Sequence, residues 1–271
     1  MAKPAVNGII NSLSLLQTSL RTGVMTSQVM FGTTSSVNFN PIGFIESCYK
    51  QKFGTPRQSG LVPEARSVLR IDPSFQPEIS LEGLMAFSHV WVIFVFHALK
   101  DYSFHGKVHP PRLEGKSIGL FATRSPHRPN PIGLSLVRLG QITGNEIELW
   151  GGDFVEGTPV LDIKPYLKEV ESKPEATSGW AEGKTQILLE ASISYSESAT
   201  TQMSSIKMDF PNPKGHPALF KKVLEETISL DPRPQLYKGL NREHIMRLWD
   251  WDVFFTVEES NVFIHKILKI N

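Results

Sequence analysis

Short apolar segments, separated by turns rich in glycine and proline, follow one another along the chain from Pro41 onward. The longest uninterrupted apolar run is Val90–Phe96, and the β-branched and aromatic residues around it predict a strand over His89–His97. A run that is apolar on both faces is typical of a strand buried on both sides. We therefore expect this segment to be buried on both faces.

Further strands are predicted before and after that segment. Thr143-Gly144-Asn145 is a hairpin signal between two apolar runs. The expected strands are Ile42–Ser47, Ser117–Thr123, Leu134–Gln141, Glu146–Trp150 and Thr158–Ile163. No long helical pattern separates them, which disfavours a doubly wound sheet and favours a mainly β fold with a β-barrel or closed sheet.

The last part of the chain predicts a small α+β domain. Apolar positions at helical spacing, with a proline at the start, predict a helix over Pro217–Ser229 that Asp231-Pro-Arg-Pro234 ends. The polar segment Glu169–Lys184 indicates a linker or a long surface excursion. The strands expected here are Ile187–Tyr195 and a closing hairpin of Val253–Val257 and Asn261–Leu268.

These patterns divide the chain into three parts: a poorly ordered extension (1–40), a β-barrel domain (41–168) and a C-terminal α+β domain (169–271). The extension contains no acid and is rich in Ser, and Ile9–Leu20 has the spacing of a short amphipathic helix. Such a segment resembles an organelle transit peptide, although it lacks the usual arginines. The other interpretation is an upstream start codon, with Met25 or Met30 as the beginning.

Composition narrows the class of protein. The chain has 271 residues, 40% hydrophobic and 20% charged, which is enough to bury one large core or two smaller ones and excludes disordered, collagen-like and low-complexity proteins. A single cysteine, Cys48, excludes an internal disulfide framework and fits a reducing compartment. The run Val90–Phe96 is far shorter than the roughly 20 residues of a membrane span, so we expect no transmembrane helix.

Charge is balanced overall, with 28 Lys+Arg against 27 Asp+Glu, but it is uneven along the chain. The segment His105–Arg128 holds a single acid, Glu114. Its basic residues are Lys107, Arg112, Lys116, Arg124 and Arg128, with His105, His109 and His127 among them. This excess predicts an anionic partner, and a solvated loop paired with neighbouring surfaces is an equally good interpretation.

The most unusual segment within it is Thr123-Arg-Ser-Pro-His-Arg-Pro-Asn-Pro-Ile-Gly133. Prolines lower the entropy lost when a loop is held, and arginines on a stiff loop make preorganised sites for anions. The structural alternative is a rigid crossover whose arginines pair with Asp153 or Asp162. The polar content exceeds what a turn needs, which favours a functional role.

Two other segments carry polar groups that could line a site. In Gly157–Tyr166, Asp162 and Lys164 alternate with apolar residues and so share one face of a strand, as an ion pair or as the lining of a pocket. Thr55-Pro-Arg-Gln-Ser-Gly60 is a loop with hydrogen-bond donors and a flexible glycine. The familiar nucleotide-binding and hydrolase motifs are absent. His105 and His109 have no third clustered ligand, so we expect no metal.

Together these segments resemble the TsaA-like, or TrmO, family of S-adenosylmethionine-dependent tRNA methyltransferases. The resemblance runs from about Ile42 to Tyr166 and continues more weakly to about residue 268. It rests on Pro110-Pro-Arg-Leu113, Gly119-Leu-Phe-Ala-Thr-Arg-Ser-Pro-His-Arg-Pro-Asn130, Gly157-Thr-Pro-Val-Leu-Asp-Ile-Lys-Pro-Tyr166 and Asp231-Pro-Arg-Pro234. The extension before Pro41 lies outside the family pattern.

The resemblance implies a β-barrel methyltransferase that acts as a cytoplasmic homodimer on the tRNA anticodon loop, or in an organelle if the extension is a transit peptide. The implied reaction is methylation of N6 of N6-threonylcarbamoyladenosine at position 37. The implied cofactor-binding residues are Gln58, Ser59, Gly60, His97, Arg124, Leu134 and Thr158. A non-catalytic RNA-binding barrel is the alternative, and a phosphoester hydrolase is disfavoured because no metal ligands cluster.

Methyl transfer from a sulfonium is an in-line displacement, so the positioning of the two reactants dominates. The sulfur is a cationic sulfonium before transfer and a neutral thioether afterwards, so cations beside it would repel the bound cofactor. Arg124 and Arg128 are therefore expected to hold a carboxylate or a phosphate. The candidates for accepting the N–H proton are Asp153, Asp162 and His97, which the sequence does not rank. The expected tRNA contacts are Lys107, Arg112, Lys116, His127, Arg128, Asn130, Lys164 and Arg233.

Overall fold

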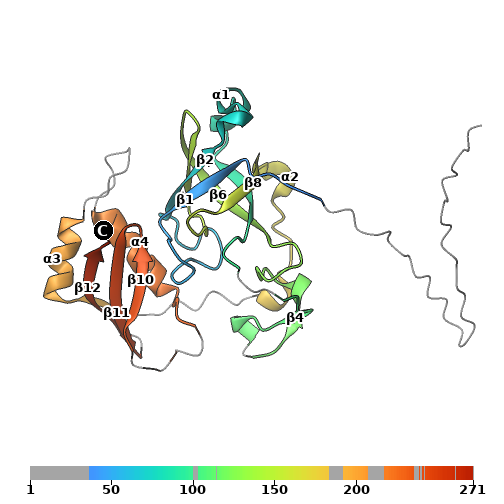
Figure 1. Cartoon of the computed structure of the whole chain (residues 1–271). Helices are drawn as coiled ribbons and strands as arrows, with labels where there is room; N and C mark the ends of the chain where they lie inside the picture. The colour runs from blue at the N-terminus through green and yellow to red at the C-terminus, as the bar shows by residue number, and fades with distance from the viewer. Residues whose placement is uncertain are drawn as a thin grey trace, which may run out of the picture. The chain divides into compact units, whose positions relative to one another are not determined.

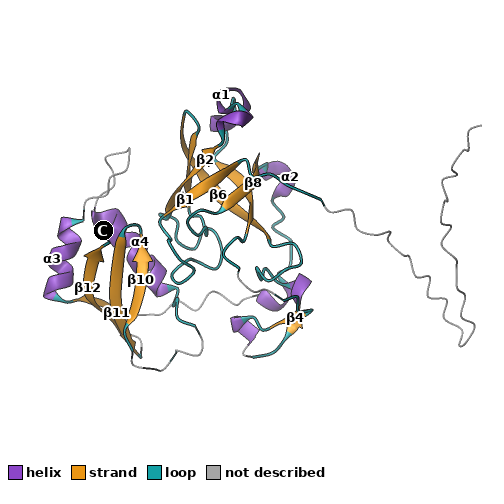
Figure 2. Ribbon diagram, in the orientation of Figure 1, coloured by secondary structure: helices purple, strands orange, loops and turns teal. Residues whose placement is uncertain are grey.

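The computed structural model describes residues 37–99, 103–113, 115–182, 192–206, 217–234, 238, 240, 242–259 and 261–270. One compact unit spans Phe39–Asn271. The possible helix Ile9–Leu20 lies outside the described residues. Within this unit the structure holds a closed barrel, a four-stranded sheet with two helices, and a two-stranded sheet (Figures 1 and 2).

Six antiparallel strands close the barrel in the order β1-β2-β7-β6-β3-β8. Their bounds are β1 (Gly43–Ser47), β2 (Arg66–Ile71), β3 (His89–Val95), β6 (Ile132–Thr143), β7 (Glu146–Trp150) and β8 (Pro159–Pro165). The mainly β fold with a barrel is therefore confirmed. The hairpin predicted at Thr143-Gly144-Asn145 joins β6 to β7, and Gly144 has the positive φ of 58° that such a turn requires.

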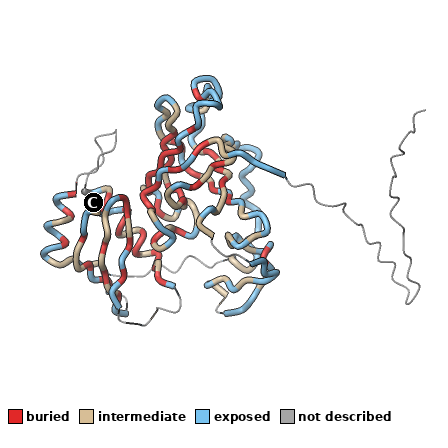
Figure 3. The backbone as a smooth tube through the Cα atoms, in the orientation of Figure 1, coloured by how far each residue is buried: buried red, intermediate tan, exposed pale blue. Residues whose placement is uncertain are grey.

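The strand expected to be buried on both faces is buried on one face. In β3 the side chains of Val90, Val92 and Phe94 are buried in the barrel core, and those between them are half-buried. Figure 3 shows how buried and less buried positions are distributed over the backbone. The expectation was wrong because the barrel wall is a single layer, so its outer face lacks the second covering layer that a doubly wound sheet provides.

Strand β2 was not predicted from the sequence. Its residues Arg66, Ser67 and Arg70 interrupt the apolar pattern, yet Arg66 and Ser67 are buried. Arg66 is neutralised inside the sheet by an ion pair with Glu148 of β7, which explains how a charged side chain occupies a buried position.

The strand expected over Ser117–Thr123 is mostly absent. Only Ile118–Gly119 (β5) is extended, and it pairs with Lys107–Val108 (β4) in a small sheet outside the barrel. The chain then turns into a short 3-10 helix, η4 (Leu120–Ala122), which the hydroxyl of Thr123 closes by donating to the carbonyl of Leu120. The other short helices are η1 (Pro73–Phe75), α1 (Pro77–Ser80), η2 (Leu84–Ala86), η3 (Pro111–Leu113), α2 (Lys168–Glu171) and η5 (Gly179–Ala181).

The C-terminal sheet has the strand order β10-β11-β12-β9. Its strands are β10 (His244–Leu248), β11 (Trp251–Glu258), β12 (Asn261–Lys269) and β9 (Ser192–Tyr195), and its helices are α3 (Glu197–Ser205) and α4 (Pro217–Ser229). The helix predicted at Pro217–Ser229 is confirmed, and so is the closing hairpin. Strand β10 and helix α3 were not predicted, and residues 187–191 of the expected strand lie outside the described residues.

The core beneath the C-terminal sheet also takes in side chains that follow β1. Cys48, Tyr49, Val62 and Ala65 are buried in one cluster with residues of α4 and β10–β12. The Tyr49 hydroxyl lies 3.3 Å from the Thr227 hydroxyl of α4. The segment between β1 and β2 therefore contributes to the second core as well as to the barrel end.

Candidate functional site

Three loops leave the barrel at the same end. Because neighbouring strands are antiparallel, the ends of β1, β7 and β3 meet the starts of β2, β6 and β8 there. The loops are residues 48–65, 96–131 and 151–158, and they carry Thr55–Gly60, most of Thr123–Gly133 and the start of Gly157–Tyr166. The opposite end carries the segment with α1, as Figure 1 shows.

Arg124 and Gln58 connect two of these loops. The Arg124 guanidinium donates a hydrogen bond of 2.8 Å to the Gln58 side-chain carbonyl oxygen, and both side chains remain accessible. The residues are 66 positions apart in the sequence. The sequence predicted both as cofactor-binding residues, and the structure brings them into contact, although their role stays a prediction.

Asp153 supplies a half-buried carboxylate on the third loop. It accepts a hydrogen bond of 2.6 Å from the Ser135 hydroxyl, which points inward from β6. Burial raises the pKa of Asp153, and this effect outweighs the Ser135 hydrogen bond and the positive charge of Arg124, which both lower it. Arg124 is thus close enough to act on Asp153 electrostatically while its hydrogen bond goes to Gln58.

Ser135 was missed by sequence reasoning. In β6, Gly133, Ser135 and Val137 are buried positions that alternate with more exposed ones, so Ser135 puts a hydroxyl among inward-facing residues. A polar residue at an inward position of an otherwise apolar strand is the signal that would have identified it.

Glycines keep open space beside these polar groups. Gly60 has a φ of 81°, and a side chain added to it would meet nothing within 4 Å. Gly157 has a φ of 73°, and an added side chain would come 4.0 Å from Nε2 of His97. His97 is exposed, whereas the Thr158 side chain is buried and donates its hydroxyl to the Val155 carbonyl. A ligand could therefore approach the backbone of both glycine turns.

The arginine-proline turn is held by its own hydrogen bonds. The Arg128 guanidinium donates to the Thr123 carbonyl at 2.9 Å, and the Trp180 indole donates to the Ala122 carbonyl at 2.8 Å. The Ser125 amide donates to the Thr123 hydroxyl at 3.2 Å. These bonds fix the turn. The structural interpretation applies to Arg128, which braces the turn, and the functional one applies to Arg124, which reaches the neighbouring loop.

The remaining predicted residues lie in several places. Lys107, Lys116, His127 and Asn130 are exposed, and Arg112 is half-buried. Asp162 forms an ion pair of 2.7 Å with Lys164 on the outer wall of the barrel, which is one of the two interpretations of that pair. Ile93 of β3 pairs with Leu134 of β6 on one side and with Asp162 of β8 on the other, so all three lie side by side on that outer wall.

Arg233 lies apart from these residues, in the C-terminal domain. Its side chain is 5% exposed and donates to both oxygens of Asp231, the shorter bond being 2.7 Å. Lys238 also pairs with Asp231, at 2.8 Å. Burial raises the pKa of Asp231, but Arg233 and Lys238 outweigh it and leave the pKa below its usual value. Arg233 thus has a structural partner, and a tRNA contact there stays a prediction.

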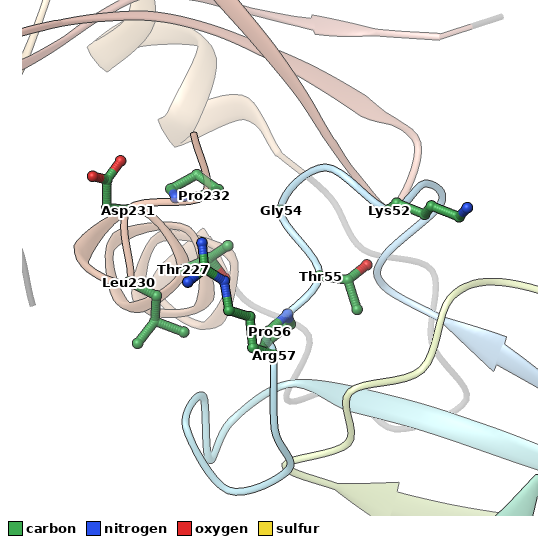
Figure 4. Close-up of a pocket in the computed structure, with 9 residues that line it drawn as sticks. All are labelled: Lys52, Gly54, Thr55, Pro56, Arg57, Thr227, Leu230, Asp231 and Pro232. Atoms are coloured by element: carbon green, nitrogen blue, oxygen red, sulfur yellow. The ribbon is translucent and has the colours of Figure 1, made fainter. Parts of the chain in front are cut away.

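A cleft of about 150 Å³ lies next to the Gln58 loop (Figure 4). It is lined by Lys52, Gly54, Thr55, Pro56 and Arg57 on one side and by Thr227, Leu230, Asp231 and Pro232 on the other. The Arg57 side chain reaches toward Thr227, while Lys52 points away from it. The cleft therefore has one cation directed inward, beside the loop that contacts Arg124.

No group of three or more His, Cys, Asp or Glu in the described part of the chain could hold a metal ion. None of the described helices is long and apolar enough to cross a membrane. The polar groups at the barrel end that matter for the proposed chemistry are the Gln58 amide, the Arg124 guanidinium, the Asp153 carboxylate and the His97 imidazole.

Comparison with known proteins covers both halves of the chain. The tRNA-methyltransferase O N-terminal domain model matches residues 44–172, and the TrmO C-terminal domain model matches residues 190–270. The tRNA (adenine(37)-N6)-methyltransferase of Escherichia coli is 37% identical over 83% of this chain and 95% of that protein. A Pseudomonas aeruginosa protein named as an S-adenosylmethionine-dependent methyltransferase is 40% identical over 79% of this chain and 90% of that protein. The crystal structure of TrmO from Pseudomonas aeruginosa superimposes with a TM-score of 0.69 at 33% identity, covering 86% of this chain and 99% of that chain.

Proposed function

The chain belongs to the tRNA-methyltransferase O family, and from that premise we propose that it transfers a methyl group from S-adenosylmethionine to N6 of the modified adenosine at position 37 of tRNA. The target we propose is N6-threonylcarbamoyladenosine, next to the anticodon. The observation that carries the proposal is the contact of Arg124 with Gln58 at the barrel end, close to the half-buried Asp153. Naming of the relatives as methyltransferases favours this function over a non-catalytic RNA-binding barrel.

The residues at the barrel end fit a cofactor with a carboxylate, hydroxyls and a flat base. The open backbone at Gly60 and Gly157 would let such a molecule lie against both turns. The residues that would hold it are Gln58, Ser59, Gly60, His97, Arg124, Leu134 and the backbone at Thr158. When bound, S-adenosylmethionine supplies an electrophilic methyl group on a positively charged sulfur. Arg124 binds a carboxylate in this arrangement, where its charge is neutralised.

Asp153 is the proton acceptor that the geometry favours. Its raised pKa makes its carboxylate a better base than an ordinary aspartate, and the Ser135 hydroxyl fixes one of its oxygens. Asp162, by contrast, is paired with Lys164 on the outer wall. Asp153 therefore takes the proton from N6 while the loops hold the two reactants in line.

The exposed cations around the arginine-proline turn support a tRNA-binding surface. Lys107 and Lys116 are exposed on the excursion that carries β4 and β5, and Arg128 is fixed at the turn. Such cations neutralise phosphates and set the register of the RNA, while the pocket reads the modified base. His127, Asn130, Arg112 and Lys164 complete the proposed surface, with Arg233 as a candidate only if its buried pair opens.

We also propose that the protein works as a homodimer. Ile132 is an exposed apolar side chain on β6, two residues before Leu134 of the proposed cofactor site, and it favours burial against a second copy. Cytoplasmic localisation is proposed as well, with an organelle as the alternative if residues 1–40 act as a transit peptide. Fusing residues 1–40 to a fluorescent protein separates the two localisations.

The decisive experiment combines binding and chemistry. Calorimetry with S-adenosylmethionine should show one site per chain, and incubation with labelled cofactor and tRNA should yield a methylated N6-threonylcarbamoyladenosine nucleoside in mass spectrometry. tRNA that lacks the threonylcarbamoyl group is the matched control. Absence of cofactor binding at millimolar concentration by the folded protein would overturn the proposed function.

A further inference from the structure

Phe121 is an exposed aromatic residue on η4, two residues before the arginine-proline segment. Its side chain is 75% exposed, and no other large apolar side chain in the described part of the chain is more exposed. Its neighbour Leu120 is 1% exposed and anchors η4 in the fold. One residue of this turn is therefore buried and the next stands in solvent, which a purely structural turn would not require.

The backbone that carries Phe121 is rigidly held. The Trp180 indole donates to the carbonyl of Ala122 at 2.8 Å, directly after the phenylalanine. The Leu120 amide donates to the Gly106 carbonyl at 3.0 Å, directly before it. An aromatic ring on a fixed backbone loses little conformational entropy when it stacks on a ligand, because it has only two side-chain torsions.

The surroundings of the ring are cationic. The Arg128 guanidinium lies over the Phe121 ring, 5.5 Å from its centre. Lys107 pairs in the small sheet with Gly119, which precedes Phe121 by two residues. Arg124 follows three residues later. Interleaved cations and an exposed aromatic ring are the combination with which proteins hold unpaired nucleotides: the cations bind phosphates and the ring stacks on a base.

We propose that Phe121 is a stacking platform for an unpaired base of the substrate tRNA's anticodon loop. This inference rests on the proposed function, and it adds a base contact to a surface otherwise expected to bind phosphates. A second copy of the chain is the less favoured occupant, because the cores of protein interfaces are depleted in charge and this ring lies among cations. The exposed apolar side chain of Ile132 on β6 suits a protein partner better.

The test compares Phe121→Ala and Phe121→Trp with Phe75→Ala. Phe75 is 41% exposed on η1, which follows β2 at the opposite end of the barrel, so it controls for loss of a surface phenylalanine. We expect Phe121→Ala to raise the KM for tRNA about tenfold, with the KM for S-adenosylmethionine and the melting temperature unchanged. Phe121→Trp should restore the tRNA KM, since an indole stacks at least as well.

The possible outcomes separate the two proposals. An unchanged tRNA KM in Phe121→Ala, with an active wild type, overturns the stacking role alone. A wild type that binds the cofactor but methylates no tRNA overturns the proposed function. Sedimentation could show that Phe121→Ala shifts the protein toward monomers. If tRNA affinity is lost only in step with that shift, the ring contacts a second copy and the stacking role is overturned. An equal effect of Phe75→Ala shows a nonspecific surface effect and overturns it too.

Discussion

Two aspartates with arginines nearby, one at the barrel end and one in the C-terminal domain, have pKa shifts of opposite direction. Asp153 is half-buried, its hydrogen bond comes from the neutral Ser135 hydroxyl, and its partial burial raises its pKa. Asp231 is fully buried, but Arg233 and Lys238 pair with it directly and its pKa is lowered. The comparison shows that the distance from cation to carboxylate, and not burial alone, decides which charge state the fold favours.

The difference also explains two arginines that look alike in the sequence. Arg124 and Arg233 both lie in proline-rich segments. Arg233 has an acid two residues before it and is folded onto it, whereas Arg124 has no acid nearby in sequence and contacts an uncharged amide. An arginine whose acid is local becomes a structural ion pair, and one without it stays available for an external anion.

Arg233→Ala should give the largest effect on stability. It leaves the buried Asp231 with Lys238 alone, so we expect the free energy of unfolding to fall by about 3 kcal/mol. Urea denaturation measures this change, and the KM for cofactor in the remaining folded protein should be unaltered. A fully stable variant that has lost tRNA affinity would instead make Arg233 a substrate contact and would break the comparison.

Asp153→Asn should give the largest effect on activity. We expect kcat to fall about a hundredfold, since general-base catalysis contributes roughly that much or more. In the wild type, kcat should drop as pH falls through the raised pKa of Asp153, at a higher pH than an ordinary aspartate near 3.9 would give. Asp162→Asn is the matched control and should keep both the rate and the pH profile.

The same two aspartates should affect stability in opposite directions as pH changes. Because the folded pKa of Asp153 is raised, its contribution is complete below its unfolded pKa and is lost as pH rises through its folded pKa. Because the folded pKa of Asp231 is lowered, its contribution is present above its unfolded pKa and is lost as pH falls through its folded pKa. At neutral pH, Asp153→Asn should therefore stabilise the protein slightly and Asp231→Asn should destabilise it.

Arg124→Ala should have a smaller effect, confined to function. We expect kcat/KM to fall at least about tenfold, about 1.4 kcal/mol, because a charge-assisted contact to the cofactor is lost. The melting temperature should hardly move, since the guanidinium is exposed and its partner Gln58 is uncharged. A large loss of stability with unchanged cofactor affinity would show that Arg124 acts structurally, as Arg233 does.

Salt dependence should respond to the exposed lysines of the excursion. Lys107→Ala with Lys116→Ala should reduce the slope of log K for tRNA against log salt by about one to two units, because fewer counterions are released. Lys168→Ala with Lys173→Ala, exposed on and after α2, is the matched pair and should leave the slope unchanged. An unchanged slope in the first pair would place the RNA elsewhere.

Deletion of residues 1–38 should have the smallest effect. The family models begin at residue 44, and the site is built from residues after Cys48. Cofactor affinity, measured by calorimetry, and the salt slope should therefore match those of the full chain. A loss of either would give the extension a direct part in binding.

The sequence predicted much of the barrel because its strands alternate apolar residues around clear turns, as in β7 and the hairpin before it. The prediction of strands failed where a charged side chain is buried against a partner that is distant in the sequence. Arg66 of β2 is neutralised by Glu148, which is 82 residues away, so its burial is invisible locally. The same limit applies to the site: Arg124 and Gln58 were named separately, but their contact depends on barrel closure.

The ion pair of Arg233 could have been predicted, because its partner Asp231 is only two residues away in the sequence. The prolines on both sides of Arg233 favoured the prediction of a tRNA contact instead. Ser135 was missed for a third reason, since a serine on a strand is common and only its inward direction makes it unusual. Residue types were thus easier to predict than the direction in which side chains point.

The closure of the barrel has a consequence for how long a bound ligand remains. The seam between β1 and β8 is short, formed by the pairs Gly43/Val160 and Phe44/Pro159, and the next backbone bond joins the Ile45 amide to the Thr158 carbonyl. The chain around Gly157 and Thr158 thus forms part of the β1–β8 seam and, in the proposed function, also contacts the cofactor. A ligand that binds only the closed barrel lowers the population of barrels opened at this seam by mass action. Residence time of the cofactor and resistance of the barrel to proteases then rise and fall together.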